Sequence, residues 1–384
     1  ASDWSSDVCS SDLLQNEKEK CYNISKLCFE SGCDMKKCTQ VGDFRTFGVT
    51  VDKDGGAMFT FEVQTTAQPR ILLFDRMAKT PVDDIALSDE YSFGRVYSVY
   101  VRGFAWDRLC YLLCRDGETV VDPYAPVTVG REIWMNEDRI AEGYKIYGGF
   151  PSGEFHWHAA PVHIAPEDMI IYKLHLRGYT MLNGLSATKR GTYRGILAKL
   201  PYLKELGVTS LEFLPLYDFE EIRYQYHYEI DEDKKTVKVA EEPVGTNFWG
   251  YGAANYFAPK ASYFGGKNPD VHMKELVDAI HKEGMEIIME ISYVPETSRD
   301  VMLDNLIYWV REYRIDGFHL LGIDLPIKRI AQNAYLGATK IFYDQFPLEL
   351  LGRQSEPKHL FVANDEFIYP LRRLQNHFDG NVAE

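Results

Sequence analysis

Residues 285–321 read MEIIMEISYVPETSRDVMLDNLIYWVREYRIDGFHLL, and this stretch decides the fold. The apolar run over 285–292 predicts a buried strand, the apolar spacing over 300–313 predicts a helix, and 316–321 predicts a second strand. Buried strands joined by a helix indicate a parallel pair with a crossover connection. The alternation extends outward in both directions and predicts strands at 169–176, 208–214 and 359–363, and helices at 195–206, 271–283 and 327–346.

This alternation of strands and helices predicts a (β/α)8 TIM barrel, an α/β fold whose functional side chains lie at the C-terminal ends of the strands. Five strands can be counted before Glu384, whereas a barrel closes with eight, so we expect a barrel that is incomplete at the C-terminus. Upstream, short alternating segments separated by turn signals predict an all-β, immunoglobulin-like sandwich. Its expected strands are 57–63, 70–75, 95–101 and 110–114.

The chain is therefore expected to divide into five parts. Residues 1–13 (ASDWSSDVCSSDL) look like a translated sequencing adapter fused to a metagenomic reading frame, and we exclude them from the fold. The other parts are an N-terminal segment of uncertain structure (14–46), the β-sandwich (47–142), a linker rich in Gly, Pro and aromatic residues (143–167), and the partial barrel (168–384).

The composition narrows the possible partners. Forty-two Lys and Arg against fifty-seven Asp and Glu give a net charge of −15, which repels nucleic acid and acidic membrane surfaces. No apolar stretch is long enough to cross a bilayer and no signal peptide is recognisable, so we expect a cytoplasmic protein, although the natural N-terminus is uncertain. Four cysteines lack the paired spacing of zinc sites, which favours free thiols over metal binding: Cys21, Cys28, Cys33 and Cys38. We expect neither a metal nor a cofactor.

Three runs of the barrel part carry a family resemblance. Residues 171–180 (IYKLHLRGYT), 201–208 (PYLKELGV) and 247–259 (NFWGYGAANYFAP) resemble the family motifs YELHVRGFT, PYLKELGV and NYWGY…NFFAP. These belong to the α-amylase superfamily, glycoside hydrolase family 13, on its isoamylase, pullulanase and glycogen-debranching side. The sandwich ends in 121–125 (VDPYA), which is similar to the end of a carbohydrate-binding module family 48 domain. The resemblance implies an α-glucan partner such as glycogen, starch, pullulan or a maltooligosaccharide.

The resemblance also assigns roles to side chains. Tyr251 inherits the position of a sugar platform, for which a flat ring is suited, and Trp249 and Tyr293 are further candidates for substrate binding. By composition alone, core packing explains the aromatic cluster of Phe248, Trp249, Tyr251 and Tyr256 equally well.

The carboxylates of the family's chemistry are missing from their expected places. A retaining glycosidase needs a nucleophile and an acid about 5 Å apart. The nucleophile motif DGFRFD of the fourth strand reads DGFHLL here (316–321), so His319 replaces the arginine and Leu321 replaces the nucleophile. The third-strand motif DVVFNH reads EISYVP (290–295), which puts Pro295 at the histidine. Asn364 stands where we expect the acid of the fifth strand.

Two hypotheses follow from these substitutions. One is a catalytically degenerate, glucan-binding member of the family, which is supported further by a short connection after 285–292 where active relatives carry a long loop. The alternative is an active α-1,6 or α-1,4 glucan hydrolase or transglycosylase that uses relocated carboxylates, for which the candidates are Asp324, Asp365 and Glu366. The string NHFD (376–379) resembles a late family motif but comes too early for it. Two carboxylates facing each other beside Tyr251 would favour the alternative.

Overall fold

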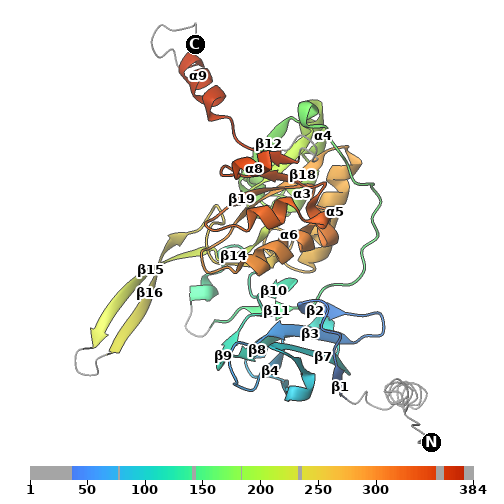
Figure 1. Cartoon of the computed structure of the whole chain (residues 1–384), viewed down its shortest axis with the longest axis vertical. Helices are drawn as coiled ribbons and strands as arrows, with labels where there is room; N and C mark the ends of the chain where they lie inside the picture. The colour runs from blue at the N-terminus through green and yellow to red at the C-terminus, as the bar shows by residue number, and fades with distance from the viewer. Residues whose placement is uncertain are drawn as a thin grey trace, which may run out of the picture.

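The structure, a computed structural model, describes residues 37–76, 78–140, 144–182, 184–231, 236–351 and 359–375. A two-sheet β-domain forms the N-terminal part, and a parallel sheet covered by helices forms the C-terminal part, beside it in Figure 1. Cys21, Cys28, Cys33 and the string 376–379 lie outside the described residues. None of the helices in the described ranges combines the length and apolar composition that a bilayer crossing requires.

The N-terminal domain is a sandwich of two antiparallel sheets, as the alternating segments predict. The first sheet has the order β1-β7-β3-β2 with β6 beside β7, and the second has the order β10-β11-β8-β4-β5 with β9 beside β8. Inward-facing side chains such as Phe59, Ile71, Val99 and Leu113 form its buried core. The strands are β1 (Cys38–Val41), β2 (Gly48–Val51), β3 (Ala57–Glu62), β4 (Arg70–Asp75), β5 (Asp83–Ala86), β6 (Ser92–Phe93), β7 (Val96–Arg102), β8 (Leu109–Arg115), β9 (Glu118–Val120), β10 (Val127–Val129) and β11 (Tyr147–Gly149).

The C-terminal part is built on a parallel sheet of six strands in sequential order, which is the order of a TIM barrel. Helices connect successive strands of the sheet, and apolar side chains of strands and helices share one core. The strands are β12 (Ile171–Leu174), β13 (Ser210–Phe213), β18 (Glu286–Ser292), β19 (Gly317–Leu321), β20 (Lys340–Phe342) and β21 (Leu360–Phe361). The helices are α2 (Leu176–Met181), α3 (Tyr193–Leu197), α4 (Leu200–Glu205), α5 (Pro269–Lys282), α6 (Arg299–Tyr313), α7 (Ile327–Ala331), α8 (Leu348–Leu351) and α9 (Asp365–Gln375).

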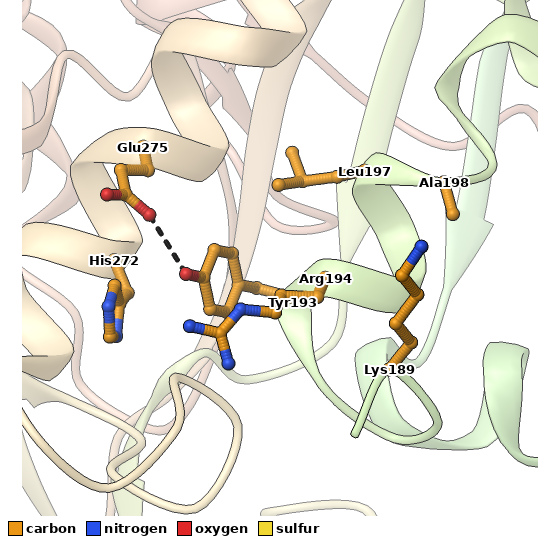
Figure 2. A pocket seen from close by; sticks show the side chains of 7 residues that line it. All are labelled: Lys189, Tyr193, Arg194, Leu197, Ala198, His272 and Glu275. Atoms are coloured by element: carbon orange, nitrogen blue, oxygen red, sulfur yellow. Dashed lines mark hydrogen bonds between the residues drawn. The ribbon is translucent and has the colours of Figure 1, made fainter. Parts of the chain in front are cut away.

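The helix expected over 195–206 is divided into α3 and α4. Pro201 lies in the first turn of α4, where its missing N–H breaks no helical hydrogen bond. A hollow opens between α3 and α5 and is lined by side chains of both helices (Figure 2).

One expectation about the barrel strands is wrong. The stretch 327–346, expected to be helical throughout, ends its helix α7 at Ala331 and later forms strand β20, which pairs with β19 and β21. The sheet therefore holds six strands in the described residues instead of five, and the strand expected to be the fifth is the sixth. Three residues of β20 (KIF) are too short for a periodicity signal, and only pairing on both sides reveals the strand.

Two antiparallel pairs follow β13 that the sequence did not predict. Strands β14 (Tyr217–Phe219) and β17 (Ala254–Pro259) pair with each other, and the long strands β15 (Ile222–Asp231) and β16 (Thr236–Thr246) form a hairpin. The hairpin projects from the body of the protein in Figure 1. The connection after β18 is short, as expected, because α6 begins at Arg299, seven residues after Ser292.

Candidate functional site

Four charged or polar side chains meet on one face of the barrel sheet. Lys173 of β12 and Glu212 of β13 are register partners, and so are Glu290 of β18 and His319 of β19. Glu212 pairs with Ile288, so Glu290, two residues further along its strand, faces the same side. We call these four residues the strand cluster. Its side chains lie side by side because parallel strands in register present them at neighbouring positions.

Lys173 joins the two carboxylates of the strand cluster. Its Nζ lies 3.0 Å from Oε1 of Glu212 and also forms an ion pair with Oε2 of Glu290. His319 donates from Nδ1 to Oε1 of Glu212 at 2.8 Å. The exposed fractions of Glu212 and Glu290 are 6% and 1%, so both carboxylates are largely removed from water. Ion pairs and hydrogen bonds replace the lost hydration.

The environment of the strand cluster keeps Glu212 and Lys173 charged. Burial acts to raise the pKa of Glu212, but the hydrogen bond from His319 and the ammonium of Lys173 outweigh burial and hold the pKa below its usual value. Burial acts to lower the pKa of Lys173, and the two carboxylates outweigh it and raise the pKa. An acid that must donate a proton at neutral pH needs a raised pKa, and Glu212 has the opposite shift.

By geometry, three members of the strand cluster could hold a cation. Ligand atoms of Glu212, Glu290 and His319 all lie within 4.8 Å of one another. The ammonium of Lys173 already supplies positive charge to both carboxylates, so the structure needs no metal ion there.

Tyr251 lies next to the strand cluster. Its hydroxyl donates to Oε1 of Glu290 at 2.5 Å, while 42% of the residue is exposed. Trp249 is 54% exposed. Both rings are thus accessible to a ligand, as a sugar platform requires.

His175, at the end of β12, fixes the segment that carries these two aromatic residues. Its ring stacks on Phe248 with centroids 4.4 Å apart, and its Nε2 lies 2.8 Å from the carbonyl oxygen of Phe248. Its Nδ1 accepts from the backbone N–H of Gly178, so Nε2 carries the proton. Burial lowers the pKa of His175, which keeps the ring neutral and the hydrogen-bond pattern intact.

Leu321 is the last residue of β19, as expected, and lies on the same face of the strand as His319. The position expected for the nucleophile therefore holds an alkyl side chain next to the strand cluster. Leucine offers neither a nucleophile nor a negative charge to an oxocarbenium-like transition state. Pro295 lies in the exposed connection between β18 and α6.

The three carboxylates considered as replacements lie in loops or on α9. Asp324 follows β19 with a left-handed backbone (φ 62°) and forms a bidentate ion pair with Arg299, in which Nε is 3.0 Å from Oδ2. Asp365 begins α9, and Glu366 is exposed on the same helix. Figure 1 shows α9 extending away from the barrel sheet.

Because β20 is the fifth strand of the sheet, the acid of the fifth strand is expected after β20 and not after β21. Asn364 follows β21, which is the sixth strand, so it does not occupy the end of the fifth strand. The fifth strand is β20, and the chain continues from it into Tyr343 and the exposed Asp344. Asp344 is thus the carboxylate that follows the fifth strand, and the sequence reading missed it because β20 was expected to be helical.

The structure also corrects the role expected for Tyr293. Expected to bind substrate, it is 3% exposed, and its hydroxyl donates to Oδ1 of Asn305 at 2.8 Å. Its ring packs against Tyr256 with centroids 5.0 Å apart. Tyr293 therefore belongs to the barrel core, because the short connection after β18 folds it under α6.

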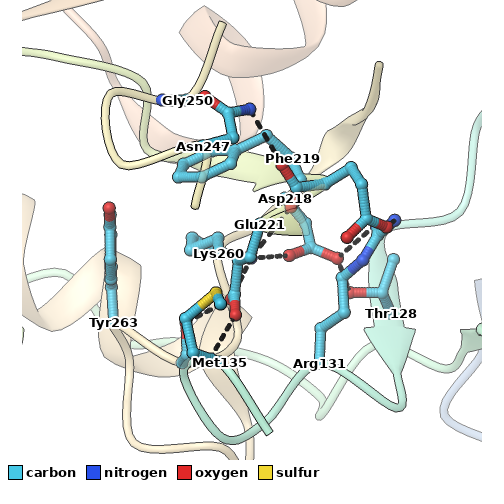
Figure 3. Close-up of polar contacts among 12 residues, drawn as sticks. Thr128, Arg131, Met135, Asp218, Phe219, Glu221, Asn247, Gly250, Lys260 and Tyr263 are labelled. Atoms are coloured by element: carbon cyan, nitrogen blue, oxygen red, sulfur yellow. Dashed lines mark hydrogen bonds and ion pairs between the residues drawn. The ribbon is translucent and has the colours of Figure 1, made fainter. Parts of the chain in front are cut away.

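A second charged network lies where the barrel meets the segment after β10 (Figure 3). Lys260 is fully buried, with Nζ 2.9 Å from Asp218 and 2.6 Å from Glu221. Arg131 binds Asp218 from the other side at 3.1 Å. Burial acts to raise the pKa of Asp218, but the charges of Lys260 and Arg131 outweigh it and lower the pKa. The network holds the segment between β10 and β11 of the sandwich against β14.

The sequence contains part of the information that predicts the strand cluster. Lys173 and Glu212 are the single charged residues of short apolar strands, and Glu290 lies within an apolar strand whose other charged residue is Glu286 at its start; this pattern marks buried functional or paired groups. In the motif YELHVRGFT the position of Lys173 is a glutamate, so its charge is reversed in this chain. The pairing itself depends on register between three strands, which the sequence does not display.

Comparison with known proteins identifies the class of fold. Residues 178–293 match the α-amylase catalytic domain. A pullulanase from group B Streptococcus in complex with maltotetraose superposes with a TM-score of 0.62 at 18% identity, over 83% of this chain and 50% of that chain. Bacillus subtilis type I pullulanase complexed with maltose gives a TM-score of 0.60 at 19% identity, over 85% of this chain and 52% of that chain. The C-terminal part is therefore an α-amylase-type barrel domain preceded by a β-domain.

Sequence relatives define the branch of that family. Chloroplastic isoamylase 3 of Oryza sativa subsp. japonica is 28% identical over 334 residues, which are 67% of this chain and 41% of the relative. The glycogen operon protein GlgX homolog of Haemophilus influenzae is 32% identical over 171 residues, which are 41% of this chain and 24% of the relative. The barrel part of the chain is thus similar to the α-amylase family, on its isoamylase and pullulanase side. The chain spans less than half the length of these curated relatives, and its sandwich is consistent with a carbohydrate-binding module of family 48.

Proposed function

We propose that this protein binds α-glucans through its barrel face and its β-sandwich without hydrolysing them. The observation that carries the proposal is the side chain at the end of β19, where Leu321 stands on the same face as the strand cluster. Hydrolysis with retention needs a carboxylate nucleophile and a proton donor. Binding needs aromatic faces and a few hydrogen-bonding groups, and these are present.

The exposed rings of Trp249 and Tyr251 support the binding half of the proposal. Both are accessible, and Tyr251 is held at one end by its hydrogen bond to the buried carboxylate of Glu290. A ring held in place loses little conformational freedom when a sugar stacks on it. The pullulanases with similar folds are complexed with maltotetraose and maltose, which are α-glucans.

The ion pairs and hydrogen bonds of the strand cluster support the other half of the proposal, that the chain does not hydrolyse glucans. Both oxygens of Glu290 are engaged, Oε2 by the ammonium of Lys173 and Oε1 by the hydroxyl of Tyr251, and both contacts stabilise this carboxylate in place. Glu212 is held by Lys173 and His319. Releasing either carboxylate leaves a buried charge without its partner, which costs about 3–5 kcal/mol for a fully buried pair.

A second candidate function, hydrolysis by relocated carboxylates, has a specific observation in its favour. Carboxylate oxygens of Glu212 and Glu290 lie within 4.8 Å beside Tyr251, close to the separation of a retaining pair. Asp344, after the fifth strand, adds an exposed carboxyl group near the expected place of an acid. Lys173 lies between the pair and the low pKa of Glu212 opposes proton donation, so we favour binding alone.

The test pairs a binding assay with an activity assay on the purified full chain. Affinity electrophoresis in gels that contain glycogen measures binding, and release of reducing ends from glycogen and pullulan measures hydrolysis. We expect retarded migration and no sustained release. Glu290→Gln and Asp344→Asn serve as matched variants, because they remove a charge while they keep the shape of the side chain.

Each alternative gives a different result in this design. Reducing-end release that either matched variant abolishes would overturn the proposal and assign catalysis to that carboxylate. Release that all variants share equally would come from a contaminating hydrolase. Unretarded migration of the native chain would overturn the binding half, irrespective of the activity result.

A further inference from the structure

We propose that the hollow between α3 and α5 binds a phosphorylated sugar through Lys189 and Arg194. The hollow has a volume of about 600 Å³ and is lined by Lys189, Tyr193, Arg194, Leu197, Ala198, His272 and Glu275. This volume lies within the range of sites for small molecules. Figure 2 shows the lining side chains on the two helices and on the loop that carries Lys189, with the Arg194 guanidinium beside the Tyr193 ring.

The hollow is lined by more cations than anions, although the whole chain carries a net charge of −15. Within the described ranges, neither Lys189 nor Arg194 forms an ion pair with a carboxylate, whereas the buried Arg131 and Arg139 both do. The one acidic lining residue, Glu275, accepts the hydroxyl of Tyr193 at 2.9 Å. Two cations without carboxylate partners face the same small volume as His272, so the hollow attracts an anion.

The environment of Tyr193 argues against a neutral glucan as the occupant. This ring is 2% exposed, with His272 stacked on it at 5.0 Å and the Arg194 guanidinium 5.2 Å from its centroid. Both neighbours cover the ring, so it offers no free face on which a sugar could stack. Stacking positions Arg194 instead, because the guanidinium lies on a ring that Glu275 and His272 hold in place.

The remaining lining residues indicate an organic group attached to the anion. Leu197 and Ala198, at the end of α3, form an apolar side of the hollow. The cationic and apolar sides together match a sugar ring that carries a phosphate ester, with the phosphate at Lys189 and Arg194. His272 donates from Nδ1 to the carbonyl oxygen of Phe264 at 2.5 Å, so its Nε2 is the ring nitrogen left to interact with a hydroxyl or the phosphate.

Isothermal titration calorimetry on the full chain tests the proposal with glucose 6-phosphate, glucose 1-phosphate, inorganic phosphate and maltotriose as separate probes. We expect a sugar phosphate to bind, and its affinity to fall as ionic strength rises. Arg194→Gln and Lys189→Gln should each weaken this binding on the order of tenfold, since each removes a charge-assisted hydrogen bond. Lys282→Gln is the matched control, because it removes one charge from the opposite end of α5.

The outcomes separate the possible ligands. Equal affinity for inorganic phosphate and sugar phosphate would retain the anion site and remove the sugar from the proposal. Maltotriose binding that Arg194→Gln abolishes, or no binding of any phosphate at millimolar concentration, would overturn it. Tyr251→Ala should leave sugar phosphate binding unchanged, so the result is independent of the glucan-binding proposal.

Discussion

The hydroxyl of Tyr251 donates a 2.5 Å hydrogen bond to Oε1 of Glu290, and this bond joins an accessible ring to a buried carboxylate. Burial and the bond to Glu290 raise the pKa of Tyr251 above its usual value, so the hydroxyl remains a donor at neutral pH. The chain thus holds in place the ring that we propose as a glucan platform, although the position expected for a nucleophile, two residues beyond His319, is Leu321.

Removing the ring should weaken glucan binding. Tyr251→Ala is expected to lower glycogen affinity about fivefold, the equivalent of the ~1 kcal/mol of a stacking contact. Tyr251→Phe keeps the ring but loses the bond to Glu290, and we expect a smaller loss. Affinity electrophoresis in glycogen gels measures both. Tyr202→Ala, which removes another exposed tyrosine on α4, is the control and should migrate as the native chain. Equal effects of Tyr251→Ala and Tyr202→Ala would contradict the platform assignment.

Removing the cation of the strand cluster should destabilise the protein. Lys173→Met leaves the carboxylates of Glu212 and Glu290 facing each other without their shared partner. Because 42% of the Lys173 side chain is exposed, we expect a loss of about 1–3 kcal/mol in the free energy of unfolding, below the range for fully buried pairs. Urea denaturation at pH 7 measures it, with Lys204→Met as the control for an exposed ion pair.

The same variant should change how stability depends on pH. The pKa of Glu212 is lowered in the folded protein, so its contribution to stability is present above the unfolded value of about 4.3 and is lost as pH falls through the folded pKa. In Lys173→Met the pKa of this carboxylate should rise, so the variant should lose less stability on acidification than the native protein. Denaturation midpoints measured from pH 7 down to about pH 3 cover this window, and parallel curves would show that Lys173 does not set the pKa.

The buried network around Lys260 should contribute more to stability than an exposed pair. Lys260→Met leaves Asp218 and Glu221 buried without their common cation, and we expect a loss of about 3–5 kcal/mol in the free energy of unfolding. Lys204→Met breaks the pair with Glu283, whose members are partly exposed, and should cost less than about 1 kcal/mol. Urea denaturation of the two variants gives the comparison. Equal costs would mean that water reaches the network.

Restoring a carboxylate at the end of β19 should not by itself restore hydrolysis. We expect Leu321→Asp to retain glycogen binding and to release no reducing ends, because His319 replaces the positioning arginine and Lys173 still holds Glu290. The reducing-end assay with pullulan and glycogen measures this, and Leu321→Asn is the uncharged control. Sustained release by Leu321→Asp alone would show that the rest of a catalytic site, with Asp344 as its acid, is in place.

The sequence predicted the main helices and strands of the barrel but missed strand β20 and the hairpin of β15 and β16. The helices α5 and α6 and the strands β18 and β19 were predicted within two residues of their bounds, because their apolar periodicity extends over many residues. Strand β20 was missed because three residues carry no periodicity, and this error moved the expected acid position from Asp344 to Asn364. The hairpin of β15 and β16 was also missed, although its tyrosine-rich alternation from Ile222 is typical of a strand.

The sequence by itself predicted the family resemblance, the alternation of the longer barrel strands and helices, and a leucine at the position expected for the nucleophile, because each is a property of local periodicity or of a single position in a motif. Only the tertiary structure decided which carboxylates meet. Glu212, Glu290 and Lys173 lie on three strands, and their contact depends on the register of those strands. The burial of Tyr293 against Asn305 likewise depends on how α6 packs on β18, and this burial keeps the ring from any glucan. Packing and register act between distant segments, so no local pattern in the chain records them.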